Sequence, residues 1–120
     1  MADAAQLKAA TEALRERLPS GGTNLHGAFD AVTALPGGPD NIFLITDGLP
    51  TQSYEPPRRT TISGRDRLSL FRKAVQRLPS GVPVNIILAP MEGDPMAASE
   101  FWQLAQVSGG SFMSPSRDWP

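Results

Sequence analysis

The feature that most constrains this chain is a short apolar run that ends in a carboxylate. Residues 39–51 read PDNIFLITDGLPT, so Ile42 to Ile45 form an unbroken apolar stretch. The stretch is too continuous for a half-exposed strand and too short for a helix, and it predicts a strand covered on both faces. Asp47 then lies just beyond the strand, followed by the turn residue Gly48. In open parallel α/β sheets, ligands bind outside the carboxyl ends of the strands, so Asp47 is a candidate site residue.

Helical and extended patterns alternate along the rest of the chain. Apolar residues at helical spacing predict an amphipathic helix over residues 3–18 and a second helix that begins at Thr23 or Asn24 and reaches Leu35. The strand over 41–46 is followed by a long polar loop over 50–64, a third helix over 68–78 and a second buried strand over 82–88. Asp94 and Pro95 predict the start of a fourth helix, and residues 111–114 a short last strand. The residues of the fourth helix that we expect to face inward are Ala98, Phe101, Trp102 and Ala105.

This order of elements predicts a single α/β domain over residues 1–120. We expect a three-layer, Rossmann-like arrangement of about three strands and four helices, with a mostly parallel sheet flanked by the helices. A chain of 120 residues is long enough for one core but short for a complete doubly wound sheet, so the domain is expected to be abridged.

Composition excludes several classes of function. The 11 basic and 12 acidic residues give no basic excess, which argues against nucleic-acid binding. The chain has no cysteine, so it has no disulfides, thiolate metal sites or cysteine nucleophiles. No apolar run is long enough to span a bilayer, and we expect a soluble chain that makes no membrane contact itself.

Two oxygen donors are expected to meet in one crevice. Thr23 precedes a helix and Asp47 ends the adjacent strand, so the hydroxyl and the carboxylate can point to the same place. Hydroxyl and carboxylate oxygens suit a hard cation such as Mg²⁺ or Mn²⁺. Each residue also has a simpler interpretation, because Thr is a common helix cap and an Asp before Gly is a common turn residue.

The same residues carry a resemblance to a known family. Gly22-Thr23-Asn24-Leu25, then a helix, then Ile45 to Thr51 resembles the second and third motifs of a von Willebrand factor type A domain. The strand over 82–88 and the sequence from Phe101 to Gly110 are similar to the closing elements of that family. The resemblance implies a non-enzymatic protein-interaction module with a metal-ion-dependent adhesion site. In that site Thr23 and Asp47 are metal ligands, and Asn24, Gly48 and Thr51 form the rim against which a partner protein binds.

One motif of that family is missing. Its metal site also uses an Asp-x-Ser-x-Ser sequence at the end of the first, central strand, and this sequence occurs nowhere in the 120 residues. The chain therefore resembles the C-terminal part of such a domain, and the central strand would lie beside the strand over 41–46. One carboxylate and one hydroxyl compete poorly with water for Mg²⁺, so we expect weak or no metal binding by this chain alone. The tail over 115–120 resembles bacterial proteins that carry this domain after a membrane-spanning N-terminus.

Two other functions stay open at this point. Asp47 could be the phosphoacceptor of a receiver-like or phosphatase-like domain, although Leu49 stands where the phosphatase pattern has a second Asp and Ala89 where the receiver has a Lys. The chain could also be a metal-free structural or assembly piece. In that case the strand over 41–46 exposes an unpaired hydrophobic edge, through which we expect the chain to self-associate.

Overall fold

A computed structural model describes residues 3–18, 20–53, 61–89 and 94–115. Arg58 and Arg59 of the polar loop and residues 116–120 of the tail lie outside this part of the chain. The elements, in order, are α1 (Ala4–Glu16), α2 (Leu25–Thr33), β1 (Ile42–Thr46), α3 (Gly64–Val75), β2 (Val84–Leu88), α4 (Ala97–Ser108) and β3 (Phe112–Met113). This order is the predicted one, with boundaries that differ by a few residues.

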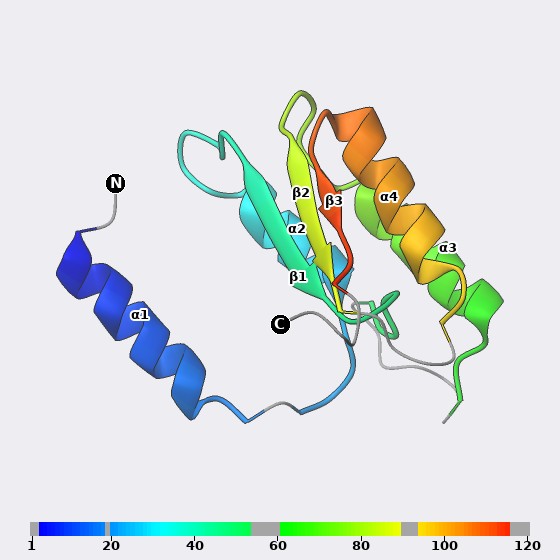
Figure 1. The fold of residues 1–120 in the computed structure, drawn as a ribbon, viewed down its shortest axis with the longest axis horizontal. Coiled ribbons are helices and arrows are strands. Elements are labelled where there is room, and N and C mark those ends of the chain that lie inside the picture. The colour runs from blue at the N-terminus through cyan, green and yellow to red at the C-terminus, as the bar shows by residue number, and fades with distance from the viewer. Residues whose placement is uncertain (1–2, 19, 54–60, 90–93, 116–120) are drawn as a thin grey trace.

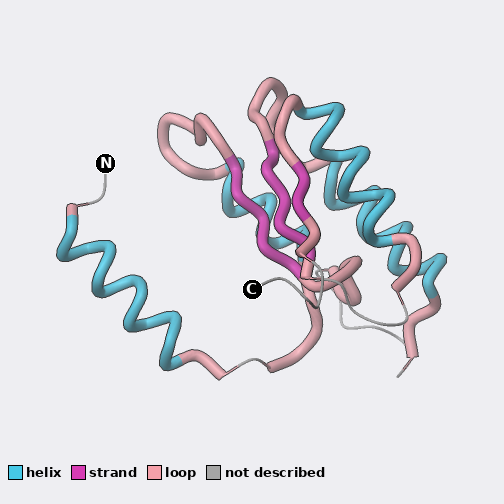
Figure 2. The backbone as a smooth tube through the Cα atoms, viewed as in Figure 1, coloured by secondary structure: helices cyan, strands magenta, loops and turns pink. Residues whose placement is uncertain are grey.

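The three strands form one parallel sheet in the order β1-β2-β3 (Figures 1 and 2). Ile42 pairs with Val84 and Thr46 with Leu88, while Ile86 pairs with Phe112. Each crossover between neighbouring strands contains one helix, α3 between β1 and β2 and α4 between β2 and β3. The predicted α/β class, with a parallel sheet and four helices, is confirmed.

The core lies on one face of the sheet. Side chains alternate between the two faces of a strand, and in β2 Val84, Ile86 and Leu88 point to the same side and are buried. Helices α2, α3 and α4 cover this side, and the rings of Phe71 and Phe101 meet edge to face at 4.9 Å between centroids. The helical residues of the core are Leu25, Phe29, Phe71, Ala74, Ala97, Phe101, Leu104 and Ala105.

Among the described residues, the opposite face of the sheet is open. Phe43 and Ile45 of β1 are 74% and 73% exposed, and Met113 of β3 points to the same side. The prediction that β1 is covered on both faces is therefore wrong for this chain. An unbroken apolar run indicates a strand. It does not indicate whether the same chain covers both faces of that strand. Of the three layers expected, the described residues form the sheet and the helices on one side.

Helix α1 stands apart from the rest of the domain (Figure 1). Asp3 caps it in a capping box with Gln6, so the helix is locally well specified. None of its residues is buried, and Leu7 and Leu14 on its apolar stripe are exposed. The predicted amphipathic helix exists, but its apolar stripe has no partner within the described chain. No described helix is long and apolar enough to cross a bilayer.

Two predictions about α4 are corrected: of the four residues expected to face inward, Phe101 and Ala105 do so but Ala98 and Trp102 do not, and Asp94 is not the N-cap. Its inward face is formed by Ala97, Phe101, Leu104 and Ala105, while Trp102 and Ala98 are exposed. The N-cap residue is Met96, which makes no capping hydrogen bond through its side chain. Asp94 is not the cap because its carboxylate is engaged in a buried contact with another loop, described below.

Candidate functional site

The carboxyl end of β1 turns sharply after Thr46. The Thr46 hydroxyl donates a hydrogen bond of 3.1 Å to the carbonyl oxygen of Gly48, which holds the turn closed. Asp47 lies between these two residues and is exposed. The turn therefore presents the Asp47 carboxylate at the end of the sheet, where the sequence predicted it.

A second loop, residues 22–24, is held against the segment that follows this turn. The Thr23 amide donates to Thr51 Oγ1 at 2.9 Å, and the amides of Thr51 and Gln52 donate to the Thr23 carbonyl oxygen at 2.9 and 3.0 Å. Asn24 Nδ2 donates to the Ser53 carbonyl at 3.2 Å. Gly22 has no room for a side chain, because a Cβ there would collide with Thr51 and Gln52. These contacts fix the position of Thr23 relative to the end of β1.

Asn24, and not Thr23, caps α2. Its Oδ1 accepts from the Gly27 amide at 3.0 Å, which satisfies a free donor of the first helical turn. The simple interpretation of Thr23 as a cap is therefore wrong. Within the part of the chain that the structure describes, neither the Thr23 hydroxyl nor the Asp47 carboxylate makes a hydrogen bond or an ion pair.

Thr23 and Asp47 line one open pocket of about 380 Å³ at the carboxyl end of β1. The remaining lining residues are Leu25, Leu44, Ile45, Thr46 and Ala89. The pocket thus has an apolar wall and two oxygen donors without protein partners. That donor set fits a hard cation in its chemistry, but it supplies only one negative charge. The described residues contain no group of three or more His, Cys, Asp and Glu side chains that could hold a metal by themselves.

Two residues that the sequence analysis did not select hold the turn from behind. Asp94 Oδ2 accepts from the Leu49 amide at 2.7 Å and forms an ion pair of 2.8 Å with Arg67 Nη2, which also donates to the Leu49 carbonyl at 2.6 Å. The two charged side chains are only 13% and 4% exposed. We call Arg67, Asp94 and Leu49 the turn clamp.

The turn clamp leaves no space for a larger residue at position 48. A Cβ on Gly48 would lie 2.6 Å from Asp94 Oδ2. The sequence analysis named Asp94 only at the start of the fourth helix and did not name Arg67. The sequence gives little indication of this ion pair, because one Arg and one Asp separated by 26 intervening positions form no local pattern.

The predicted rim residues have mixed environments. Asn24 and Thr51 are half-buried and are used in the contacts between the two loops, while Gly48 is buried. The contact of these residues with a partner protein stays a prediction. Their contacts within the domain place these residues beside the pocket that Thr23 and Asp47 line.

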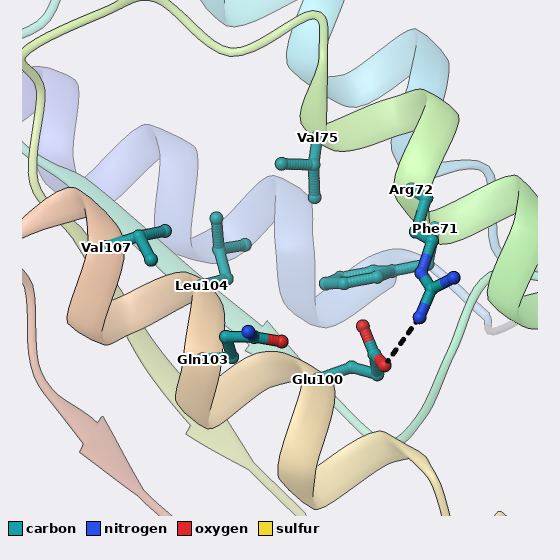
Figure 3. A pocket seen from close by; sticks show the side chains of 7 residues that line it. All are labelled: Phe71, Arg72, Val75, Glu100, Gln103, Leu104 and Val107. Carbon is teal, nitrogen blue, oxygen red and sulfur yellow. Dashed lines mark hydrogen bonds and ion pairs between the residues drawn. The ribbon is translucent and has the colours of Figure 1, made fainter.

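A second hollow, of about 270 Å³, lies between α3 and α4 (Figure 3). Phe71, Val75, Leu104 and Val107 provide its apolar lining, and an Arg72–Glu100 ion pair of 3.4 Å lies at its edge. Glu100 is the one carboxylate among its lining residues, and it already has a cationic partner. This hollow therefore does not offer a second pair of unpartnered oxygen donors.

Comparison with known proteins agrees with the geometry. A search of curated proteins and a search of solved structures each gave no match. The family model of the von Willebrand factor type A domain matches residues 1–111, which includes Thr23, Asp47 and all the elements except β3. With a parallel sheet, a threonine loop and a strand-ending aspartate at one pocket, this chain belongs to the von Willebrand factor type A domain family.

Proposed function

We propose that this domain is a non-enzymatic protein-interaction module whose contact site is the pocket at the carboxyl end of β1. Membership of the family indicates a protein-interaction module. The finer proposal is that Thr23 and Asp47 hold Mg²⁺ or Mn²⁺, and that a carboxylate of a partner protein completes the coordination. Asn24, Gly48 and Thr51 would then lie at the edge of the contact.

One observation carries this proposal. The Thr23 hydroxyl and the Asp47 carboxylate line the same pocket, and neither is used by another described residue. The neighbouring Asn24 and Thr46 side chains are used in contacts of the fold, whereas these two groups remain available to a ligand. The two loops that carry the donors are also fixed, by the contacts with Thr51 on one side and by the turn clamp on the other.

The chemistry explains why binding would be weak and open to a partner. A bound divalent cation would act as a Lewis acid toward an incoming carboxylate. With one charged ligand, the protein neutralises only part of the cation's charge, so an anionic group from a partner is favoured at the remaining positions. Mg²⁺ gives up its water reluctantly, and we expect a dissociation constant of about 1 mM or weaker for the cation alone.

Binding of Mn²⁺ to the 120-residue chain tests the metal ligands directly. The loss of the free-ion signal in electron paramagnetic resonance measures affinity, and broadening of backbone amide signals in NMR measures position. We expect Mn²⁺ to broaden the amides of residues 23 and 47, and Asp47→Asn to weaken binding by at least about tenfold. Thr23→Val, which keeps the shape and the backbone contacts, should weaken binding by a smaller factor.

Asp40 provides the matched control. It is an exposed aspartate that precedes β1, at the opposite end of the strand from Asp47. Asp40→Asn removes the same charge from the chain and should leave Mn²⁺ binding unchanged. Equal binding by the wild type and Asp47→Asn would end the metal proposal.

The phosphoacceptor alternative predicts a different result for Asp47. Ala89, at the position where a receiver domain has a lysine, lines the same pocket and brings only a methyl group to it. There is thus no cation at that position to stabilise a phosphoryl group, and we expect no adduct. The chain should be incubated with acetyl phosphate and Mg²⁺ and analysed by intact-mass spectrometry. A mass increase that is lost in Asp47→Asn would favour the enzyme-like alternative over the interaction module.

A further inference from the structure

We infer that Arg67 and Asp94 are positioning residues of the site at the carboxyl end of β1, although neither of them lines its pocket. Through the segment of residues 49–52, the turn clamp sets where the Thr23 hydroxyl and the Asp47 carboxylate lie relative to each other. This inference rests on the proposed metal site, and it adds the residues that determine how well the two donors fit one cation.

The segment of residues 49–52 is bonded to the loop that carries Thr23. The amides of Thr51 and Gln52 donate to the Thr23 carbonyl oxygen at 2.9 and 3.0 Å. The Thr23 amide in turn donates to Thr51 Oγ1 at 2.9 Å. A displacement of this segment would therefore carry the Thr23 loop with it.

Asp47 is tied to the sheet instead. The preceding residue, Thr46, is the last residue of β1, and its carbonyl oxygen accepts from the Ala89 amide at 2.8 Å. The Thr46 hydroxyl also closes the turn on the carbonyl oxygen of Gly48. Because one donor follows the sheet and the other follows residues 49–52, the position of that segment decides the spacing of the two donors.

The turn clamp holds the segment in place through Leu49. The Leu49 amide donates to Asp94 Oδ2 at 2.7 Å, and its carbonyl oxygen accepts from Arg67 Nη2 at 2.6 Å. Leu49 itself is buried. The charged pair also packs against Gly48, where a Cβ would lie 3.1 Å from Arg67 Nη2. Two charged side chains therefore fix the first residue of the segment.

The two charged residues of the turn clamp come from separate crossovers of the sheet. Arg67 lies in the first turn of α3, and Asp94 lies shortly before α4. Figure 1 shows both helices beginning at the same end of the domain as the arrowhead of β1. The ion pair thus fixes the turn after β1 relative to the starts of both helices.

A positioning role and a purely electrostatic role predict opposite results for Arg67→Met. Removal of the guanidinium takes away one positive charge beside Gly48 and leaves the Asp94 carboxylate without its cation. Coulomb attraction alone would then strengthen the binding of a divalent cation. Loss of the contact with Leu49 instead lets the spacing of the two donors vary, which weakens binding.

Binding of Mn²⁺ to the 120-residue chain, measured by the loss of the free-ion signal in electron paramagnetic resonance, tests the inference. We expect Arg67→Met to weaken binding by at least about fivefold. Arg67→Lys should bind at least about threefold more tightly than Arg67→Met, because both contacts of Arg67 come from the single atom Nη2 and an ammonium group carries three donors. Unchanged or tighter binding by Arg67→Met, or equal binding by the two variants, would overturn the inference.

Gly110→Ala separates this effect from a general loss of stability. Gly110 precedes β3, at the opposite end of the sheet from the pocket, and a Cβ there would collide with the backbone of Val84. This variant should be destabilised but should bind Mn²⁺ like the wild type, under conditions where circular dichroism shows each variant folded. Equal weakening by Gly110→Ala and Arg67→Met would show that the turn clamp acts through stability alone.

Backbone amide relaxation in NMR, without any metal, distinguishes a failure of this inference from a failure of the metal site. The order parameters of the amides of residues 23 and 47 should be about 0.85 in the wild type and in Gly110→Ala, and below about 0.6 in Arg67→Met. If the wild type binds no Mn²⁺ while these order parameters fall, the metal proposal fails and the positioning of the two donors stands. Unchanged order parameters in Arg67→Met would overturn the inference.

Discussion

At the residue scale, the turn clamp explains how an exposed aspartate keeps a fixed position. The Asp47 carboxylate has no partner among the described residues, so its position depends on the backbone of the following turn. Asp94 and Arg67 bind both the amide and the carbonyl of Leu49, and Leu49 and Pro50 are buried beneath them. A charged pair removed from water is retained here together with two backbone hydrogen bonds at Leu49, although the Arg67 Nε is buried without a hydrogen-bond partner in the described part of the chain.

Removal of one charged partner of the turn clamp should lower the free energy of unfolding. Arg67→Met keeps much of the side-chain volume but leaves the Asp94 carboxylate buried without its cation, and we expect a loss of about 3 kcal/mol in the free energy of unfolding. The midpoint of urea denaturation, followed by circular dichroism, measures this change. Arg72→Met is the control, because the Arg72 side chain is 66% exposed and its pair with Glu100 should contribute at most about 1 kcal/mol. Similar losses of unfolding free energy in both variants would show that the burial of the turn clamp adds nothing to the stability of the domain.

At the element scale, the packing of β3 depends on a close approach to β2. β3 has two residues, and the chain reaches it through Gly110, where a Cβ would collide with the backbone of Val84. Around this point Ser108 Oγ accepts from the Val84 amide at 3.0 Å, and the Ser111 amide donates to Asn85 Oδ1 at 3.1 Å. Only glycine lets the end of α4 and the start of β3 lie this close to β2.

Gly110→Ala should therefore separate β3 from β2. We expect a loss of about 1–3 kcal/mol in the free energy of unfolding, as for an overpacked core, because backbone atoms cannot move aside as a side-chain tip can. Amide hydrogen exchange should also become faster at Ile86, which donates to the Ser111 carbonyl at 2.8 Å. Gly64→Ala, at the first residue of α3 with nothing within 4 Å, should be neutral or slightly stabilising. A stable Gly110→Ala variant with unchanged exchange would contradict the role of this close approach.

Local sequence patterns predict which helices and strands form, but they do not predict every buried face. The apolar run of β1 and the capped helices were predicted because their signals are local, and the structure confirms the elements. In α4 the spacing of apolar residues allowed more than one inward face. The predicted set of Ala98, Phe101, Trp102 and Ala105 has helical spacing, and the structure keeps Phe101 and Ala105 on the inward face but has Ala97 and Leu104 there in place of the other two. Both sets of four residues lie on one side of a helix, so helical spacing alone does not decide between them.

At the scale of the whole molecule, the described residues leave three apolar surfaces uncovered among themselves: the stripe of α1, the edge of β1 and the open face of the sheet. The core on the other face joins α2, α3 and α4 into one cluster with the sheet. A parallel sheet is usually covered on both faces, whereas the described residues cover one.

The sequence by itself determined the order of helices and strands, the parallel α/β class, and the choice of Thr23 and Asp47 as candidate ligands. These follow from spacing, turn residues and motifs, which act over a few neighbouring positions. Only the tertiary structure decided that Asn24 caps α2 and leaves the Thr23 hydroxyl available, that Arg67 and Asp94 hold the turn, and that one face of the sheet is open. Each of these depends on residues distant in the chain meeting in space, and no local pattern encodes which distant side chain will satisfy a buried charge or cover an apolar strand.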